Sequence, residues 1–120
     1  MVIDEFRATV RCQLGMLIID LHGVVNADAK HGLQAAYDRA ESCGVSFIVL
    51  NFGHVEYMNS TGMAHIVHLL SEAQQAKRRV GVYGLSEHYR LIFRVTRLDE
   101  FMSIYVDEAS ALASIGEPVQ

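Results

Sequence analysis

Hydrophobic and polar residues alternate at the start of the chain in the pattern of two neighbouring strands. In residues 6–12, "FRATVRC", every second side chain from Ala8 onward is apolar, which is typical of a half-exposed strand. Residues 14–15, Leu-Gly, suit a tight turn, and the more apolar run "MLIIDL" at 16–21 follows. An antiparallel hairpin is therefore expected to open the fold.

Further along the chain, apolar residues at helical spacing alternate with short apolar runs. The helices are expected to begin at residues that can cap a helix N-terminus: Asn26, Asn59 or Ser60, Ser86 and Asp107. The runs expected to form strands are 47–52, 79–84 and 102–106. The first of these, "FIVLNF", is continuous and apolar, as expected of a central strand buried on both faces. The polar stretch after it, "GHVEYMNS", is expected to be a loop.

This order of elements, β-β-α-β-α-β-α-β-α, predicts an α/β fold. Strands and helices that alternate after an opening hairpin imply a mostly parallel β-sheet of about five strands, packed with about four helices. The 120 residues are expected to form a single domain, residues 1–120, with a flexible tail at 116–120. Functional residues gather at the carboxyl ends of strands in such sheets, so the segment before Ser60 is the first place to look for a site.

The composition narrows the class of protein. Hydrophobic residues make up 51% of the chain, as in an average packed globule, and the formal net charge of −4 argues against nucleic acid as a partner. The N-terminus carries acids without an apolar core, and no apolar run reaches the roughly 20 residues of a membrane span. We expect a cytoplasmic protein without a signal peptide, in which Cys12 and Cys43 are reduced thiols of the core.

The helix expected from Ser60 has one apolar and one polar side. Its apolar side is formed by Met63, Ile66, Val67, Leu70 and Ala73. The polar side carries His65 and His68, whose i, i+3 spacing permits chelation of a metal ion. No Cys, Asp or Glu joins them at metal-site spacing, although Glu72 lies one turn further on. Solvated surface histidines are therefore the favoured interpretation, and no metal is expected.

The helix expected from Ser86 carries a basic stripe beside an apolar one. The basic stripe is Arg90, Arg94 and Arg97, and the apolar stripe, expected to face the core, is Leu91, Val95 and Leu98. Tyr89 and Phe93 then project away from the core. Exposed aromatic side chains beside arginines are typical of a protein–protein interface, and the alternative is that a neighbouring loop covers them.

The junction "YMNSTGMAH", residues 57–65, places hydrogen-bonding and flexible residues between two apolar stretches. Asn59 or Ser60 can accept from the N–H groups that the first turn of a helix leaves unpaired, so capping alone explains them. The same N–H groups and the positive end of the helix dipole accommodate a phosphate, so the Ser60 hydroxyl could carry one there. Gly62, which lacks a side chain, would let a partner approach closely.

From "IVLNF" at 48–52 to "EASALA" at 108–113, the chain resembles the STAS domain, a family named for sulfate transporters and anti-sigma factor antagonists. In that family an apolar strand leads through a loop to Asp-Ser-Ser-Gly at the start of a helix, where this chain has "NSTG". A short Gly-containing strand, an Arg-containing helix ending near Leu-Asp-x-Phe, here "LDEF", and a Glu-Ala-x-x-Ala segment follow in the same order. Upstream, "LHGVVNADA" resembles the family's Leu-x-Gly stretch.

The resemblance implies a phosphorylation switch. In stand-alone family members, the first Ser of the motif is phosphorylated by a partner kinase that also sequesters a sigma factor. Only the unphosphorylated form binds that kinase and frees the sigma factor, and a phosphatase resets the switch. Aligned on Gly62, Ser60 is the expected phosphoacceptor and Thr61 the second choice, while Asn59 shapes the site. Asn59 stands where the family has Asp and Asn51 where its strand has an acid, and both departures remove negative charge.

The resemblance also implies the partners. These are an anti-sigma factor/serine kinase of the histidine-kinase-like ATPase type and a PP2C-type phosphatase. The residues expected to bind the partner are Tyr57, Met63, Tyr89, Arg90, Phe93 and Arg94. The kinase would supply ATP and Mg²⁺, so no cofactor is expected in this chain. The alternative is a constitutive STAS subunit of a transport or other regulatory complex. No enzyme activity is expected, because Ser60 lacks a Gly-x-Ser-x-Gly setting.

Overall fold

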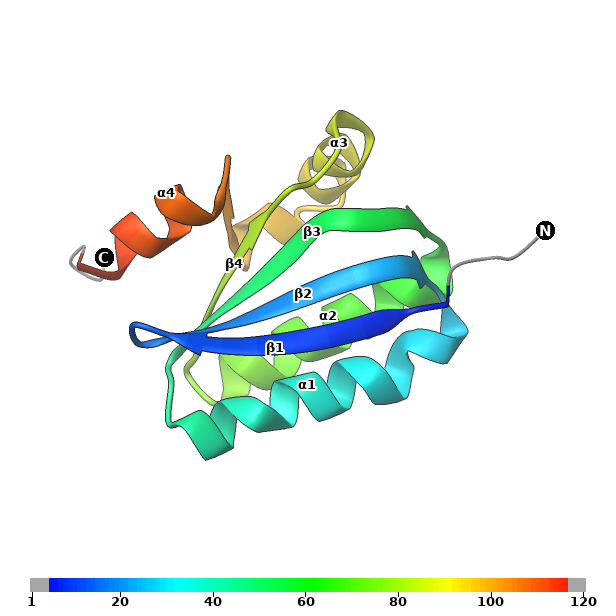
Figure 1. The fold of residues 1–120 in the computed structure, drawn as a ribbon. Helices are drawn as coiled ribbons and strands as arrows, with labels where there is room; N and C mark the ends of the chain where they lie inside the picture. The colour runs from blue at the N-terminus through cyan, green and yellow to red at the C-terminus, as the bar shows by residue number, and fades with distance from the viewer. Residues whose placement is uncertain (1–4, 117–120) are drawn as a thin grey trace.

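Five strands and four α-helices alternate along residues 5–116, the part of the chain that the structure, a computed structural model, describes (Figure 1). The elements are β1 (Arg7–Gln13), β2 (Met16–Val25), α1 (Lys30–Cys43), β3 (Phe47–Met58), α2 (Ser60–Gln75), β4 (Arg79–Tyr83), α3 (Glu87–Val95), β5 (Ser103–Tyr105) and α4 (Glu108–Ala113), with 3₁₀ turns at Ala27–Ala29, Leu98–Glu100 and Ser114–Gly116. The expected α/β order is confirmed. Beyond Gly116, the expected flexible tail lies outside the described residues.

The strands form one mixed sheet in the order β1-β2-β3-β4-β5. β1 is antiparallel to β2, and the turn between them has positive φ at Leu14 (50°) and Gly15 (87°), as a tight two-residue hairpin requires. The three other strand pairs are parallel. The predicted sheet, mostly parallel and opened by an antiparallel hairpin, is therefore confirmed.

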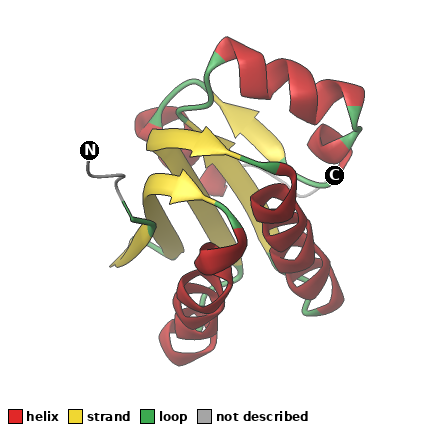
Figure 2. Ribbon diagram, turned by 90° about the vertical axis from the view of Figure 1, so that its right-hand side faces the viewer, coloured by secondary structure: helices red, strands yellow, loops and turns green. Residues whose placement is uncertain are grey.

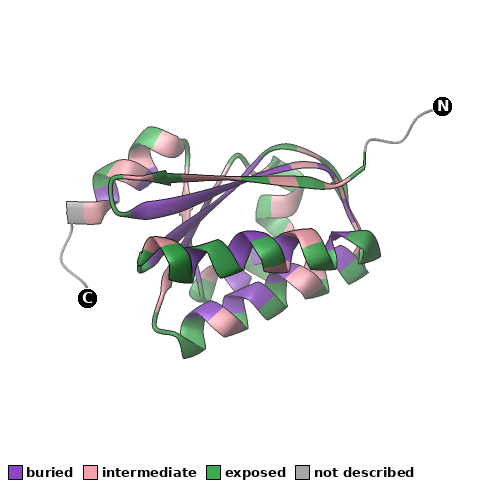
Figure 3. Ribbon diagram, turned by 60° about the horizontal axis from the view of Figure 1, so that its bottom comes forward, coloured by how far each residue is buried: buried purple, intermediate pink, exposed green. Residues whose placement is uncertain are grey.

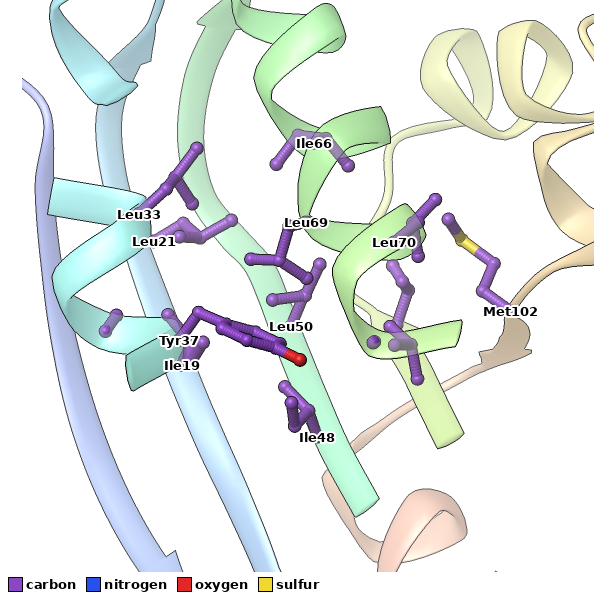
Figure 4. Packing of buried hydrophobic residues seen from close by; sticks show 14 of the residues in the cluster. Ile19, Leu21, Leu33, Tyr37, Ile48, Leu50, Ile66, Leu69, Leu70 and Met102 are labelled. Atoms are coloured by element: carbon purple, nitrogen blue, oxygen red, sulfur yellow. The ribbon is translucent and has the colours of Figure 1, made fainter. Parts of the chain in front are cut away.

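Helices cover both faces of this sheet. α1 and α2 lie side by side on one face, where their buried side chains meet those of β2 and β3 (Figures 2 and 4). Along both helices buried positions alternate with exposed ones (Figure 3). The shorter α4 packs on the opposite face, where Ala111 joins Met16, Ile18, Phe47 and Val49. β2 and β3 are thus covered on both faces over their first halves, which is why "FIVLNF" is continuously apolar.

Polar side chains close the helix starts at the predicted places. Asn59 caps α2, Ser86 caps α3 and Asp107 caps α4, each by accepting a backbone N–H of the first turn. Asn26 accepts the N–H of Asp28 and so caps the 3₁₀ turn that leads into α1. At α2 the structure therefore selects Asn59, not Ser60, as the cap.

β3 continues for six residues beyond the predicted strand. Residues 53–58, predicted to be a loop, pair with β2 up to Met58 after a bulge that shifts the register between Asn51 and His54. The Oδ1 atom of Asn51 accepts the N–H of Gly53 at 2.9 Å, within this bulge. The loop prediction is wrong because most of residues 53–58 are exposed, so that the segment has the polar composition of a loop although its backbone pairs with β2.

Cys12 and Cys43 are joined by a disulfide bond, so the prediction of two reduced core thiols is wrong. Cys12 is exposed near the end of β1, and Cys43 is the half-buried last residue of α1. α1 packs against β1, which brings together two cysteines that are 31 residues apart in the sequence. Such a spacing carries no signal of pairing. The expected cytoplasmic location loses the support that reduced cysteines gave it.

None of the helices in residues 5–116 is long and apolar enough to cross a membrane.

Candidate functional site

The start of α2 is held by hydrogen bonds that leave two N–H groups of its first turn unpaired within the helix. The Oδ1 atom of Asn59 accepts the N–H of Gly62 at 2.8 Å. The N–H of Asn59 donates to the carbonyl of Val25 at 3.1 Å, and the helical ladder begins where Met63 donates to the carbonyl of Asn59 at 2.9 Å. Of the four N–H groups at a helix start, those of residues 60 and 61 are left for solvent or a bound anion.

Ser60 and Thr61 present their side chains to solvent in this first turn. The turn contains no acidic residue, and the positive end of the helix dipole lies there. A phosphate on the Ser60 hydroxyl would therefore lie beside unpaired N–H groups and meet no like charge from its own turn. The chemistry that this arrangement supports is acceptance of an anionic group.

Gly62 is buried against the end of β2 and does not face a partner. A Cβ atom at this position would overlap the carbonyl group of Val25 and lie 3.0 Å from the backbone nitrogen of Asn26. The expectation that Gly62 makes room for a partner is therefore wrong. Its missing side chain lets the first turn of α2 dock on the backbone that follows β2, and this contact fixes where Ser60 lies.

Gly62→Ala is expected to lower the free energy of unfolding by about 1–3 kcal/mol, because the added methyl group meets backbone that cannot turn away. Urea denaturation measures the loss. The matched control is Gly32→Ala in α1, where the added methyl group meets only the side chain of Phe6 and the helix gains propensity. Equal stability of Gly62→Ala and the parent protein would contradict the assigned contact.

Two of the residues predicted to bind the partner lie three residues before and three residues after Ser60, where β3 leads into α2. Tyr57, at the end of β3, is 56% exposed, and Met63, in the first turn of α2, is half-buried against the core. Tyr89 instead links α3 to the end of β3 by hydrogen bonding. Its hydroxyl accepts the N–H of Met58 at 2.8 Å and lies 3.4 Å from the Met58 carbonyl. Tyr89 therefore holds α3 beside the segment that leads to Ser60. It is half-buried against the core, so the prediction that it projects away from the core is wrong, while its part in partner binding stays a prediction.

α3 faces the core with the side that was predicted to be exposed. Phe93 is fully buried and packs edge-to-face on Phe52, with ring centroids 6.0 Å apart. Leu91 and Val95, predicted to be core residues, are 48% and 72% exposed. The prediction of Phe93 as a partner-binding residue is therefore wrong. The helix has two apolar stripes, and the one with the larger aromatic side chains fills the core.

The two predicted arginines of α3 remain available to a partner. Arg90 and Arg94 are exposed and line a groove of about 350 Å³ between α3 and the segment that leads through β5. Leu91 and Ile104 contribute apolar surface to the same groove, and the acids Glu87 and Asp99 line it as well. Arginines beside exposed apolar side chains are common at protein interfaces, and here the exposed apolar residue of the helix is Leu91 and not the predicted aromatic residues. Partner binding through Arg90 and Arg94 stays a prediction.

A partly buried polar network that was not predicted joins four strands to α4. Asp20 on β2 accepts from Arg11 at 2.7 and 2.9 Å and from Asn51 at 2.7 Å. Arg11 also donates to Glu108, at the start of α4, at 2.7 Å, and Glu108 accepts the hydroxyl of Tyr83 at 2.8 Å. One signal was available in the sequence: an acid inside the apolar strand "MLIIDL" needs a partner.

The network lowers the pKa of both of its acids. Burial alone would raise the pKa of Asp20, but the hydrogen bonds from Arg11 and Asn51 together outweigh it and hold that pKa below its usual value. The hydrogen bonds of Arg11 and Tyr83 likewise lower the pKa of Glu108. Burial, with the hydrogen bond to Glu108, raises the pKa of Tyr83 to about 12. Asp20 and Glu108 are therefore ionised and Tyr83 neutral at pH 7.

Acid is expected to weaken the fold through this network. An acid whose pKa is lower in the folded state stabilises the protein above its unfolded pKa, and this stabilisation is lost as the pH falls through the folded pKa. The free energy of unfolding, measured by urea denaturation, should therefore fall below about pH 4.5. Arg11→Gln should flatten this fall, because it removes the cation that both acids bind. If the free energy of unfolding of Arg11→Gln fell with pH as steeply as that of the parent protein, the role assigned to Arg11 would be contradicted.

Both histidines of α2 were predicted to be solvated, and the structure agrees for one of them only. His68 is exposed and pairs with Glu72 at 2.9 Å. His65 is half-buried, and its Nε2 atom is fully buried. Within residues 5–116, no group of three or more His, Cys, Asp or Glu side chains is placed to hold a metal ion. The apolar side of α2 is also displaced from the prediction, since Val67 is 41% exposed and Leu69 is buried.

The fold and this site together define a class: a small α/β domain in which a mixed sheet presents an exposed serine at a helix start. Residues 7–111 match the sequence profile of the STAS domain, and the chain belongs to the STAS domain family. The resemblance found in the sequence is thereby confirmed.

Several anti-sigma factor antagonists are similar to this chain. A protein of Bordetella bronchiseptica, "Putative anti-sigma factor antagonist BtrV", is 29% identical over 91 residues, which are 76% of each chain. The crystal structure of an anti-sigma factor antagonist from Mycobacterium paratuberculosis superposes with a TM-score of 0.78 at 17% identity, over 92% of this chain and 94% of that one. The phosphorylated form of SpoIIAA, a Bacillus cell fate determinant, superposes with a TM-score of 0.69 at 21% identity, over 92% and 99%. The solved structures show that the fold is shared.

Proposed function

We propose that this protein is a phosphorylation-switchable binding module of the anti-sigma factor antagonist type. Its unphosphorylated form binds an anti-sigma factor/serine kinase and so releases a sigma factor. The observation that carries the proposal is the exposed hydroxyl of Ser60 at a helix start with two N–H groups unpaired in the helix and no acid in its first turn. Ser60 is the proposed phosphoacceptor, and Thr61 is the second choice.

The partner surface is proposed to surround Ser60. Tyr57 and Met63 flank the serine, and Arg90 and Arg94 supply positive charge on α3, which Tyr89 holds beside the end of β3. A partner that fits a neutral hydroxyl would have to bury a dianion after phosphorylation, and this cost is what would separate the two states. The domain itself would keep its fold, because the helix start is suited to an anion.

Other proteins would catalyse the addition and the removal of the phosphate. A kinase of the histidine-kinase-like ATPase type would bring ATP and Mg²⁺, and a PP2C-type phosphatase would remove the phosphate. The protein itself would act by binding and not as an enzyme, in the cytoplasm where sigma factors act. Since Asn59 replaces the Asp of the family motif, a kinase and a phosphatase specific for this chain would have to recognise an amide side chain at that position.

The same replacement favours a second candidate, a constitutive STAS subunit of a transport or other regulatory complex. Without the Asp that the family's kinases meet, the surface around Ser60 could dock a partner permanently. In that case no kinase would be involved, and a negative charge at Ser60 would have no regulatory role.

Affinity capture from the source organism separates the two candidates. The immobilised protein is compared with Ser60→Asp and with Ser71→Asp, a control that adds the same charge at an exposed position on the same helix. A histidine-kinase-like ATPase that is retained by the parent and by Ser71→Asp but lost from Ser60→Asp supports the switch. Transporter components retained equally by all three would support the constitutive subunit and overturn the switch.

A further inference from the structure

β3 runs past the end of β4, so its last residues have a strand on one side only. β4 pairs with β3 from Phe47 to Asn51 and ends at Tyr83. Beyond Asn51, β2 is the one strand of residues 5–116 that pairs with β3, and this pairing continues to Met58. Backbone N–H and C=O groups that point to the other side therefore need partners that are not strands.

At Met58 a single side chain supplies both partners. The hydroxyl of Tyr89 accepts the N–H of Met58 at 2.8 Å and donates to the Met58 carbonyl at 3.4 Å. A hydroxyl can do both at once, because it carries one proton and two lone pairs. The next residue, Asn59, points the other way, since its N–H donates to the carbonyl of Val25 on β2 at 3.1 Å. Residues 58 and 59 are thus held by α3 on one side and by β2 on the other.

These two residues determine where Ser60 lies. They precede it directly in the chain, and Asn59 fixes the first turn of α2 by accepting the N–H of Gly62 at 2.8 Å. A displacement of the Met58 backbone would therefore move both the cap and the serine. Tyr89 is the contact through which α3 reaches this segment.

α3 is attached to the rest of the domain at two places that can be separated by mutation. Phe93 is fully buried and supplies the apolar attachment in the core. Tyr89, one turn earlier, supplies the polar attachment at the end of β3. Arg90 and Arg94 lie on the exposed side of the same helix. Loss of the Tyr89 hydroxyl alone would keep the Phe93 contact and both arginines, and would act on the segment before Ser60.

We propose that the Tyr89 hydroxyl positions Ser60 for phosphorylation. This role rests on the function proposed above and adds a residue that controls the reaction at that site. In the transfer, the Ser60 Oγ atom forms a bond to the γ-phosphorus of ATP. The bond from that phosphorus to the β-phosphate oxygen breaks to leave ADP, and the hydroxyl proton passes to a base of the kinase. Such an in-line transfer tolerates little displacement of Oγ. Tyr89 acts through the backbone of Met58 and is not a catalytic residue.

Single-turnover phosphorylation of Tyr89→Phe, by the kinase that affinity capture retains, measures the effect. The maximal rate constant should fall about tenfold, because the serine spends less time in the reactive geometry. The kinase concentration at half-saturation should stay within about twofold, because the surface around Ser60 keeps its side chains. The matched control is Tyr37→Phe, which also removes a hydroxyl that accepts a hydrogen bond, from Arg78 at 2.9 Å, but lies on α1. It should leave both constants unchanged.

Amide hydrogen exchange of the full chain tests the positioning without a kinase. In Tyr89→Phe, the amides of Met58, Asn59 and Gly62 should exchange at least tenfold faster than in the parent protein, while those of residues 48–51, in the core of the sheet, keep their rates. Parent-like exchange of the three amides, a parent-like maximal rate, or a loss of rate through weaker kinase binding alone would overturn the proposal. If the parent protein were not phosphorylated on Ser60, the switch itself would fail, and the role of Tyr89 with it.

Discussion

Asn51→Asp is expected to lower the free energy of unfolding by about 3 kcal/mol at neutral pH, because it places a second carboxylate against Asp20. Asn51 and Asp20 face each other on β3 and β2, and the amide of Asn51 donates to the Asp20 carboxylate at 2.7 Å. Both side chains are buried, so the repulsion would be poorly screened. The substituted carboxylate would still accept the N–H of Gly53, which isolates the lost donor as the cause.

The loss should shrink in acid, because one proton shared between the two carboxylates restores a donor. The matched control is Asn59→Asp, which introduces the other acid typical of the family. It should leave stability within about 0.5 kcal/mol, since Asn and Asp cap helices about equally well. Urea denaturation of both variants at pH 7 and pH 5 measures the difference. Equal stabilities of the two variants would contradict the role given to Asp20.

Ser60→Asp is expected to weaken binding of the cognate kinase by a hundredfold or more, which corresponds to about 2.7 kcal/mol. A negative charge that an interface leaves unpaired costs several kcal/mol, whereas the exposed helix start tolerates it. The far-UV circular dichroism should therefore stay unchanged. Ser60→Ala, which is neutral and small, should retain the affinity of the parent protein.

Isothermal titration of the kinase with the three proteins measures these affinities. Ser71→Asp again controls for added charge, because it lies on the same helix at an exposed position. If Ser71→Asp weakened binding as much as Ser60→Asp, the effect would come from the overall charge of the protein and not from Ser60.

Most of the fold could be predicted because each element carried its own local signal. The hairpin turn at residues 14–15, the caps at Asn59, Ser86 and Asp107 and the run "FIVLNF" all lie where the sequence places them. Turn and cap residues act on backbone groups a few positions away, so their effect can be predicted without knowledge of the tertiary structure.

The errors arose where long-range packing selects between two local solutions. α3 has two apolar stripes in nine residues, and only its position beside Phe52 decides that Phe93 faces the core. The exposed half of β3 resembles a loop, because only its pairing with β2 makes it a strand. The disulfide depends on the packing of α1 against β1, which no spacing of cysteines encodes.

The helix cap and the serine of the candidate site could be predicted from the sequence, but the contacts that hold them in place could not. The sequence indicated Asn59 and Ser60, yet the role of Gly62 depends on how closely α2 approaches the backbone after β2. The Arg11–Asp20 pair was within reach of the sequence, since a two-residue turn at 14–15 places the two residues diagonally across the hairpin. The links of Asn51 and Glu108 to that pair required the full sheet.

Phosphosite mapping is the most direct test of the proposed switch. The protein is incubated with its cognate kinase, ATP and Mg²⁺, and the phosphate is located by peptide mass spectrometry in the parent, Ser60→Ala and Thr61→Ala. One phosphate is expected on Ser60 in the parent protein and in Thr61→Ala, and none in Ser60→Ala. Undiminished phosphorylation of Ser60→Ala, or no phosphate on Ser60 in the parent, would contradict it.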